Sequence, residues 1–399
     1  MGRFDNLSFN NDFNMYIPTR VLFGSGKLNQ LHKQEMPGKK ALIVTSNGNS
    51  VKINGYLERV EKELEKIRVG YFLFDEVEPN PLKSTVMRGA KVAIENNCDF
   101  IIALGGGSPM DAAKAISIMA TNEGDLWDYV TEGTGKGKNI ENDPLKLIAI
   151  TTTAGTGSEA DPGAVITNED TNEKTGIVTE KTFPYLSIVD PELMTTVPPT
   201  LTSYQGFDAL FHSIEGYISK GSNPLSDIFA INAIKNISEN LANTVKNGDD
   251  LESREKVAFG NTLSGFVMSV GMTTSQHSLE HAMSAFHQDL PHGAGLIMLS
   301  NAYFTFFIDR GGCNERFIEI AKVMGKKDAN DPMDFIVALE DLKEECGVSN
   351  LKMSDYDIKE DEFEKLAQNA FDSMNFLFDF DRTKLSINDC VKIYQDSYK

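Results

Sequence analysis

Five of the six histidines in this sequence of 399 residues lie between positions 212 and 292. Asp208 precedes His212 by four residues, so on a helix both side chains project from one face. His277 and His281 repeat this spacing, and His292 follows them. Imidazole and carboxylate groups together suit divalent iron, zinc, manganese or cobalt. The cluster therefore predicts a metal site, and the rest of the chain must indicate what the metal is for.

Three consecutive glycines, Gly105, Gly106 and Gly107, follow an apolar segment and precede a helical pattern. The pattern predicts a buried strand, a tight turn and a helix that Ser108 can cap, with Pro109 at its first position. Glycines allow the backbone to approach a ligand, and the free N–H groups at a helix start attract phosphate. Such a turn can equally be structural, and it does not match the dinucleotide-binding fingerprint GxGxxG. The turn alone leaves both alternatives open.

A second polar loop runs from Thr151 to Glu159 and follows another apolar segment. Its hydroxyls include those of Thr152, Thr153 and Thr156, and taken alone it is best read as a structural connection. The carboxyl ends of parallel strands meet at one edge of a sheet, where α/β folds bind ligands. Two such loops after neighbouring strands therefore favour a dinucleotide as the ligand.

The two halves of the chain differ in pattern. Short apolar runs at 41–45, 71–74, 100–104, 147–150 and 186–190 alternate with helical periods, which indicates a parallel sheet covered by helices. After Pro199 the apolar residues recur near every 3.6 positions, at about 203–219, 224–240, 253–268, 274–286, 314–324 and 333–345. We therefore predict an α/β domain over residues 1–198 and an all-α domain over residues 199–399.

The composition argues against several classes of partner. With 38 basic and 58 acidic residues the formal net charge is −20, which opposes binding to nucleic acid or to an anionic membrane. No apolar run approaches the roughly 18 residues that span a bilayer, and residues 1–10 lack the apolar core of a signal peptide. The four cysteines are scattered. We expect a soluble, cytoplasmic protein.

In this order, the motifs resemble the iron-containing (group III) alcohol dehydrogenases, particularly their butanol dehydrogenase branch. The resemblance runs from about Pro18 to Leu299 and includes Asp190–Glu192 and Gly206–Glu215 besides the two loops. It implies a Rossmann-like dinucleotide-binding domain and a helical metal-binding domain across a cleft, the dehydroquinate synthase-like superfold. It also implies hydride transfer between NAD(P)H and a short-chain aldehyde or primary alcohol, such as butanal or butanol, in a homodimer.

The resemblance also assigns residues. The implied metal ligands are Asp208, His212, His277 and His292, with Fe²⁺ as the expected ion and Zn²⁺ or another ion as alternatives. The implied cofactor-binding residues are Ser46, Gly48, Asn49, Ser50, Asn80, Gly105, Gly106, Gly107, Ser108, Asp111, Thr152, Thr153, Thr156 and Lys174.

Further side chains near the ligands receive roles from the same reading. His281 would lie near the nicotinamide, and its place beside His277 makes it the best candidate to relay a proton. Glu215 and Glu280 would orient ligands. His287 is about 80° around the helix from His277 and is expected to support a ligand or face the cleft as a polar group.

The turn after the first core strand, Thr45–Lys52, contains no acidic residue. An acid there usually accepts the ribose 2′-hydroxyl of NAD and repels a 2′-phosphate. The turn is similar to the glycine–serine loop of family members that use NADP, and Lys52 could hold the phosphate. We therefore expect NADP(H) ahead of NAD(H).

Three alternatives remain open. A glycerol or diol dehydrogenase and a dehydroquinate synthase-like lyase share the superfold, but the Asp208 and His212 pair matches the ligand pattern of the iron group. A metal-binding relative without catalysis is the third, and the retention of four ligands together with both phosphate loops argues against it.

Overall fold

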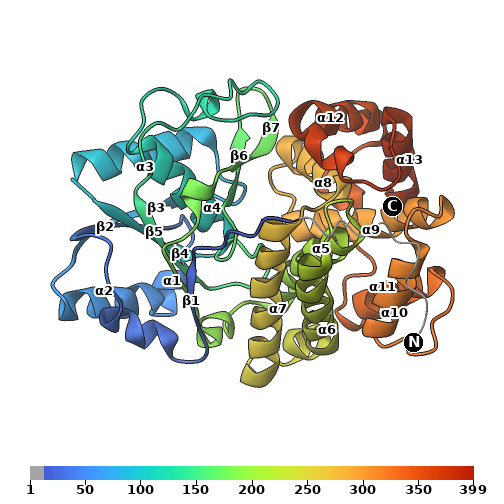
Figure 1. Cartoon of the computed structure of the whole chain (residues 1–399), viewed down its shortest axis with the longest axis horizontal. Helices are drawn as coiled ribbons and strands as arrows, with labels where there is room; N and C mark the ends of the chain where they lie inside the picture. The colour runs from blue at the N-terminus through green and yellow to red at the C-terminus, as the bar shows by residue number, and fades with distance from the viewer. Residues whose placement is uncertain (1–12) are drawn as a thin grey trace.

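A six-stranded parallel sheet forms the centre of the N-terminal half of the protein (Figure 1). The structure is a computed structural model that describes residues 13–399, so the predicted absence of a signal in residues 1–10 lies outside the described residues. The strand order is β1-β8-β5-β4-β2-β3, and every neighbouring pair is parallel. The strands are β1 (Arg20–Phe23), β2 (Lys40–Ser46), β3 (Gly70–Val77), β4 (Phe100–Gly105), β5 (Lys146–Thr151) and β8 (Leu186–Val189).

Helices cover both faces of this sheet. Along β2 and β4 alternate side chains enter different cores: Leu42 and Ile101 pack with the helix residue Val86, whereas Ile43 and Ile102 face the opposite core. Because both faces are buried, the strands read as continuous apolar runs. The helices of this half are α1 (Ser50–Ile53), α2 (Tyr56–Lys66), α3 (Lys83–Glu95) and α4 (Gly107–Met119), with 3₁₀ helices η1 (Lys27–Lys33), η2 (Leu126–Asp128), η3 (Glu180–Thr182) and η4 (Pro191–Met194).

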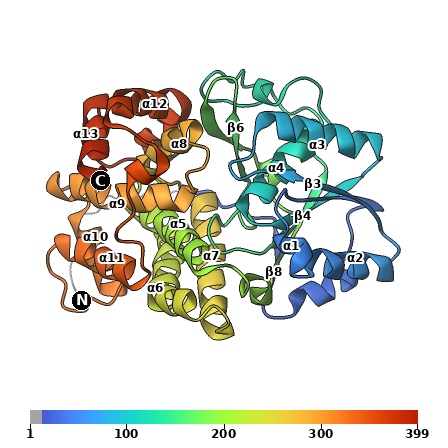
Figure 2. The same cartoon turned by 180° about the vertical axis from the view of Figure 1, so that it is seen from behind.

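A two-stranded antiparallel sheet, β6 (Gly163–Asn168) and β7 (Glu173–Val178), extends this half toward the helices of the other. Neither strand was expected from the apolar runs. The pair lies between α4 on one side and the C-terminal helices on the other (Figures 1 and 2). It therefore brings side chains of the first half to the boundary between the halves.

The C-terminal half is entirely helical (Figure 2). Its core is rich in aromatic rings, such as Phe211, Phe304 and Phe335, which pack at 5.2 to 5.9 Å between centroids. The helices are α5 (Pro199–Ile218), α6 (Pro224–Lys246), α7 (Leu251–Val270), α8 (Ser275–Phe286), α9 (His292–Asp309), α10 (Asn314–Val323), α11 (Met333–Glu345), α12 (Phe363–Asp379) and α13 (Ile387–Ser397), with η5 (Met353–Tyr356) and η6 (Glu360–Glu362). The predicted fold class, α/β followed by all-α, is confirmed.

Within residues 13–399, no helix combines the length and the hydropathy that a membrane span requires. The cytoplasmic location stays a prediction.

Candidate active site

Three helices of the C-terminal half bring the predicted metal ligands together. Asp208 and His212 lie one turn apart on α5, His277 lies in the first turn of α8, and His292 begins α9. Their side chains converge on one atom, Asp208 Oδ1, which is 3.5 Å from His212 Nδ1, 3.6 Å from His277 Nε2 and 3.4 Å from His292 Nε2. The close approach of α9 to α5 depends on Gly293, where a Cβ would come within 2.1 Å of the α5 backbone.

These atoms fit a metal ion better than they fit one another. Among the residues that the structure describes, Asp208 Oδ1, His212 Nδ1 and His277 Nε2 are buried without a hydrogen-bond partner, an arrangement that proteins avoid. Their separations exceed normal hydrogen-bond lengths. However, ligand atoms at about 2.1 Å from one tetrahedral ion would lie about 3.4 Å from one another. The distances of 3.4 to 3.6 Å between Asp208 Oδ1 and the three imidazole nitrogens are close to this value. The candidate ligand atoms of Asp208, His277 and His292 all lie within 4.8 Å of one another, and the His212 ring stacks on His277 at 4.4 Å.

Two buried carboxylates orient the imidazoles, as predicted. Glu215 Oε1 lies 2.6 Å from His277 Nδ1, and Glu280 forms a short contact with His292 Nδ1. Each carboxylate accepts a hydrogen bond from the Nδ1–H of its histidine, so the lone pair on Nε2 of that imidazole points toward Asp208. Both imidazoles are thereby held with Nε2 toward the carboxylate of Asp208.

The charges of the cluster favour a bound cation. Burial lowers the pKa of His212 to about 3, so that this imidazole is neutral and can donate its lone pair to a metal. Burial also disfavours a protonated His277, but Glu215 and Asp208 outweigh it and raise the His277 pKa to about 10. The buried carboxylates therefore require positive charge between them, whether a proton or a metal ion.

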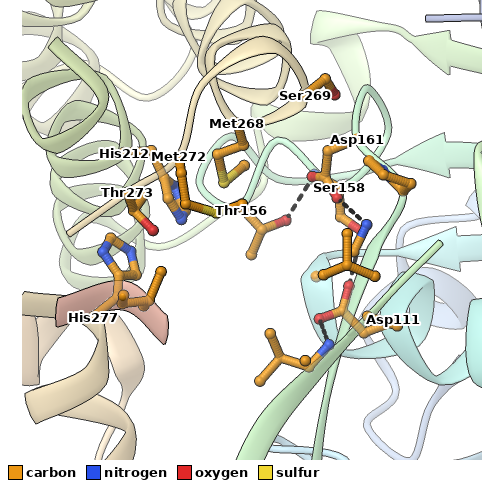
Figure 3. Close-up of a pocket in the computed structure, with 18 of the residues that line it drawn as sticks. Asp111, Thr156, Ser158, Asp161, His212, Met268, Ser269, Met272, Thr273 and His277 are labelled. Carbon is orange, nitrogen blue, oxygen red and sulfur yellow. Dashed lines mark hydrogen bonds between the residues drawn. The ribbon is translucent and has the colours of Figure 1, made fainter. Parts of the chain in front are cut away.

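A cavity of about 450 Å³ opens in front of this cluster. Figure 3 shows His212 and His277 on one side of it, Thr156 between, and Asp111 and Ser158 across from them. The predicted residues that line it are Asn80, Gly107, Ser108, Asp111, Thr156, Lys174, His212, His277, His281 and His292. Those that do not are Ser46, Gly48, Asn49, Ser50, Gly105, Gly106, Thr152, Thr153 and Asp208.

The glycine turn borders the cavity, but its helix starts differently from the prediction. α4 begins at Gly107 with Gly106 as its N-cap, and no side chain caps it, so the expectation that Ser108 is the cap is wrong. The reason is that Gly106 has an extended backbone and directly precedes the helix, so α4 starts two residues before Pro109. The N-terminus of α4, at Gly107 and Ser108, therefore borders the cavity.

The two phosphate-loop candidates also pack directly on each other. A Cβ at Gly107 would come within 2.3 Å of Thr156, and one at Gly106 within 2.9 Å of Thr153. The glycines are thus required by packing, which confirms the structural interpretation of the turn, and its role in binding a ligand stays a prediction.

Family models cover both halves of this arrangement. The model described as iron-containing alcohol dehydrogenase matches residues 18–191, and that of the C-terminal part of the Fe-containing alcohol dehydrogenase family matches residues 202–398. The chain belongs to the iron-containing alcohol dehydrogenase family. It is therefore an oxidoreductase of the alcohol dehydrogenase class, and the family implies a nicotinamide cofactor and an iron-type metal.

Relatives of this alcohol dehydrogenase differ in their named substrates. The NAD-dependent methanol dehydrogenase of Bacillus methanolicus is 35% identical over 90% of this chain and 94% of the relative, and the 1,3-propanediol dehydrogenase of Citrobacter freundii is 34% identical over 91% and 93%. An archaeal halo-thermophilic alcohol dehydrogenase from a Red Sea brine pool has a TM-score of 0.92 at 32% identity, covering 97% of this chain and 99% of that chain. The NADH-dependent butanol dehydrogenase A of Thermotoga maritima has a TM-score of 0.88 at 27% identity, covering 98% and 100%.

In this alcohol dehydrogenase, Lys174 and Asn80 connect the first half to α8. Lys174 Nζ, on β7, lies 2.9 Å from Asn80 Oδ1, 2.8 Å from Ser284 Oγ and 3.7 Å from Glu280 Oε2. Burial lowers the Lys174 pKa, with Glu280 opposing the shift. The ammonium group thus reaches the cavity next to a carboxylate that contacts the ligand candidate His292.

Asp111 is occupied within the protein. Its two carboxylate oxygens accept hydrogen bonds from Ser158 Oγ at 2.8 Å and from the backbone N–H of Val165 at 3.0 Å. Burial raises its pKa to about 6, although Lys114 opposes the shift. Asp111 therefore joins α4, the second loop and β6 in addition to lining the cavity.

The remaining two histidines of α8 differ in their surroundings. His281 is buried and lines the cavity, and its Nδ1 lies 2.7 Å from Met374 Sδ, which leaves Nε2 as the available nitrogen. His287 is the C-cap residue that follows α8, its Nε2 lies 3.3 Å from Glu362 Oε2, and it is absent from the cavity lining. Of the two roles expected for His287, the cleft-facing one is wrong, because its side chain contacts Glu362 on η6 and does not line the cavity.

The turn proposed to select the cofactor has an acidic neighbour that the sequence did not indicate. Lys52 forms an ion pair with Asp75, which lies on β3. Parallel pairing of β2 with β3 sets Val44 beside Phe74, so Asp75 follows at the same sheet edge. The turn itself has no acid, but the adjacent strand supplies one.

A wall of apolar side chains was also missed. It comes from the end of α7, from the segment between α7 and α8, and from α12, and it carries no motif: Met268, Met272, Met374, Phe376 and Leu377.

Proposed function

We propose that this alcohol dehydrogenase transfers hydride between a nicotinamide dinucleotide and a short-chain aldehyde or primary alcohol, with butanal and butanol as representative substrates. One observation carries the proposal: the imidazoles of His212, His277 and His292 and the glycine turn at the start of α4 line the same cavity. A dinucleotide held by the turn would place its reactive ring toward the histidines.

Asp208, His212, His277 and His292 would hold one divalent metal, with Fe²⁺ expected and Zn²⁺ as the alternative. When bound, such an ion supplies Lewis acidity toward the substrate oxygen. Glu215 orients the His277 imidazole by accepting a hydrogen bond from its Nδ1, and Asp208, His212 and His277 are buried.

His281 would move the proton. Its Nδ1 faces Met374, so proton transfer with the substrate hydroxyl takes place at Nε2. Burial holds the His281 pKa well below its usual range, which keeps the imidazole neutral before it accepts a proton. The neighbouring Lys174 adds to this shift.

The methionine-rich wall supports an unbranched hydrocarbon substrate. Met268, Met272 and Met374 are flexible and polarizable and fit a short alkyl chain without a specific shape. A second hydroxyl, as in 1,3-propanediol, would gain nothing from these side chains and would lose its hydration. Butanal is therefore favoured over diols and glycerol.

For the cofactor we propose NADP(H) ahead of NAD(H), on the basis of the acid-free turn. The relatives named as NAD- or NADH-dependent do not support this preference. It requires Lys52 to exchange Asp75 for a 2′-phosphate, so replacing Lys52 with alanine should raise KM for NADPH and leave KM for NADH unchanged. Equal effects on both would remove the argument.

We further propose that the protein is a homodimer. β1 is the edge strand of the sheet and pairs only with β8 among the described residues, which leaves its other side available to a second chain. Sedimentation equilibrium should give twice the mass of 44.0 kDa, and a monomer at micromolar concentration would refute the dimer.

Steady-state rates test the function as a whole. Protein reconstituted with Fe²⁺ or Zn²⁺ should reduce butanal with NADPH faster than it oxidises 1,3-propanediol or glycerol at matched concentrations. Faster turnover of a diol would replace the substrate assignment. Tight dinucleotide binding without turnover of any of these compounds would favour a relative that has lost catalysis.

A further inference from the structure

The first turn of α8 is capped by two carboxylates from other parts of the chain. Thr274 is the N-cap residue, yet its side chain makes no capping hydrogen bond. Instead, Glu215 Oε2 accepts the Thr274 N–H at 3.0 Å and Asp381 Oδ1 accepts the Ser275 N–H at 3.1 Å. Both acids are completely buried. Negative groups at this end of a helix are favoured by its exposed N–H groups.

A continuous chain of polar contacts at hydrogen-bond distance runs from Asp381 to a ligand candidate. The Tyr303 hydroxyl lies 3.1 Å from Asp381 Oδ1 and 3.0 Å from Thr274 Oγ1. The Thr274 hydroxyl donates to Glu215 Oε2 at 3.0 Å, and Glu215 Oε1 lies 2.6 Å from His277 Nδ1. Every member is almost entirely buried. The position of the His277 imidazole is therefore tied to Asp381.

The segment that carries Asp381 is itself fixed to α5. Arg382 Nε donates to the carbonyl of Ile218 at 2.8 Å, and its Nη2 donates to that of Ser219 at 2.9 Å. Both acceptors lie at the end of the helix that carries Asp208 and His212. Asp381 thus stands between α5 and α8, the two helices that supply three of the four proposed ligands.

We propose that Asp381 is a positioning residue of the metal site, which acts through Tyr303, Thr274 and Glu215 to set where the His277 imidazole points. This inference rests on the metal site proposed above. It assigns a role in metal binding to a residue from the C-terminal segment, more than 80 positions after the last proposed ligand.

The competing explanation is that Asp381 only stabilises the helix. A titration of the full-length protein, freed of metal by a chelator, with Co²⁺ separates the two, because the visible spectrum reports ligand geometry and the titration reports affinity. Asp381→Ala leaves the Ser275 N–H without its acceptor, and we expect about tenfold weaker Co²⁺ binding with an altered spectrum, at the lower end of effects seen for groups that orient ligands.

Two further variants serve as comparisons. Asp381→Asn keeps an oxygen acceptor for Ser275, and should restore the spectrum and bring affinity to within about threefold of wild type. Asp227→Ala removes a partly buried acid of the same half, which pairs with Arg316 at 2.9 Å. It should lower the thermal midpoint and leave Co²⁺ binding unchanged.

The outcomes are distinguishable. Wild-type affinity and spectrum in Asp381→Ala, with a lower thermal midpoint, would show a purely structural cap and overturn the proposal. If Asp381→Ala does not fold, Tyr303→Phe decides, because it breaks the hydrogen-bond chain and keeps the Ser275 cap: weaker Co²⁺ binding supports the proposal and unchanged binding overturns it. Failure of the wild type itself to bind Co²⁺ would refute the metal site, and this inference with it.

Discussion

Asp208 Oδ1 is the atom on which the proposed metal site depends, because imidazole nitrogens of three histidines face it. Asp208→Asn keeps the shape and removes the anionic oxygen. We expect metal affinity to fall by more than the 10- to 100-fold typical of losing an outer partner. Metal content after dialysis, measured by mass spectrometry, checks this.

A control for this variant is available at another buried carboxylate. Asp190 accepts the N–H groups of Gly26 and Leu28, both at 3.0 Å, in the first half. Asp190→Asn should lower thermal stability and keep full metal content. Full metal content in Asp208→Asn would contradict its role as a ligand.

His281 lies within α8 and His287 directly follows this helix, and the two should respond differently to replacement. His281→Ala should lower turnover about 100-fold, the lower range for loss of a group that transfers a proton, while metal content persists. His287→Ala, outside the cavity, should retain turnover. Steady-state rates and metal analysis of both proteins test this, and loss of metal in His281→Ala would make His281 a ligand instead.

At the residue scale, contacts between residues close in the sequence could be predicted, and contacts between residues far apart in it could not. The pairing of Asp208 with His212 follows from helix geometry and is visible in sequence. Asp75 reaches Lys52 only through the pairing of two strands, and Met374 reaches His281 only because α12 departs from helical geometry there, with φ −144° and ψ 43°. Neither contact has a local signal.

Among the elements, the glycine turn has the tightest packing requirement near the cavity. Gly107→Ala would force a Cβ to within 2.3 Å of Thr156, so the two loops must separate. Overpacking of this kind costs roughly 1–3 kcal/mol, and the displaced N–H groups should weaken dinucleotide binding. Thermal unfolding and fluorescence titration with NADPH and NADH measure the two effects.

Gly70 at the start of β3 provides the matched control. A Cβ there would have its nearest neighbour at 3.5 Å, an ordinary contact. Gly70→Ala should therefore bind both dinucleotides as the wild type does. Unchanged binding in Gly107→Ala would show that the turn does not contact the cofactor.

The elements that the sequence revealed are those with a clear hydrophobic pattern, either a continuous apolar run or a helical period. The five apolar runs became strands of the parallel sheet, whose inner strands are buried on both faces, whereas the edge strand β3 exposes Phe72. α9 was not predicted, since it is buried nearly all round and shows no polar face. The hairpin of β6 and β7 is short and half polar, and it owes its place to contacts with α4 and α8.

At the scale of the whole molecule, buried polar contacts join the two halves beside the cavity. Lys174 reaches Ser284, as described above, and Glu159 in the second loop reaches α7. Glu159 Oε1 accepts hydrogen bonds from Asn261 Nδ2 at 3.0 Å and Thr262 Oγ1 at 2.8 Å, while its Oε2 has no partner within residues 13–399. When Glu159 is ionised, its negative charge at the junction of the two halves is therefore poorly compensated.

Glu159 should make stability depend on pH in a defined direction. Burial raises its pKa from 4.5 to about 7, with the hydrogen bond from Thr262 opposing the shift. The folded state thus binds the proton more tightly than the unfolded state, so this contribution to stability is complete below pH 4.5 and is lost as pH rises through about 7.

Glu159→Gln stays neutral throughout and keeps an oxygen for Asn261 and Thr262. Between about pH 4.5 and pH 8.5, the wild type should therefore lose on the order of 3 kcal/mol of unfolding free energy relative to the variant. Urea denaturation of both proteins across this range measures the difference, in which other titrating groups cancel. A difference that does not change with pH would mean that Glu159 is ionised in the folded protein, and that the junction of the halves carries a compensating charge.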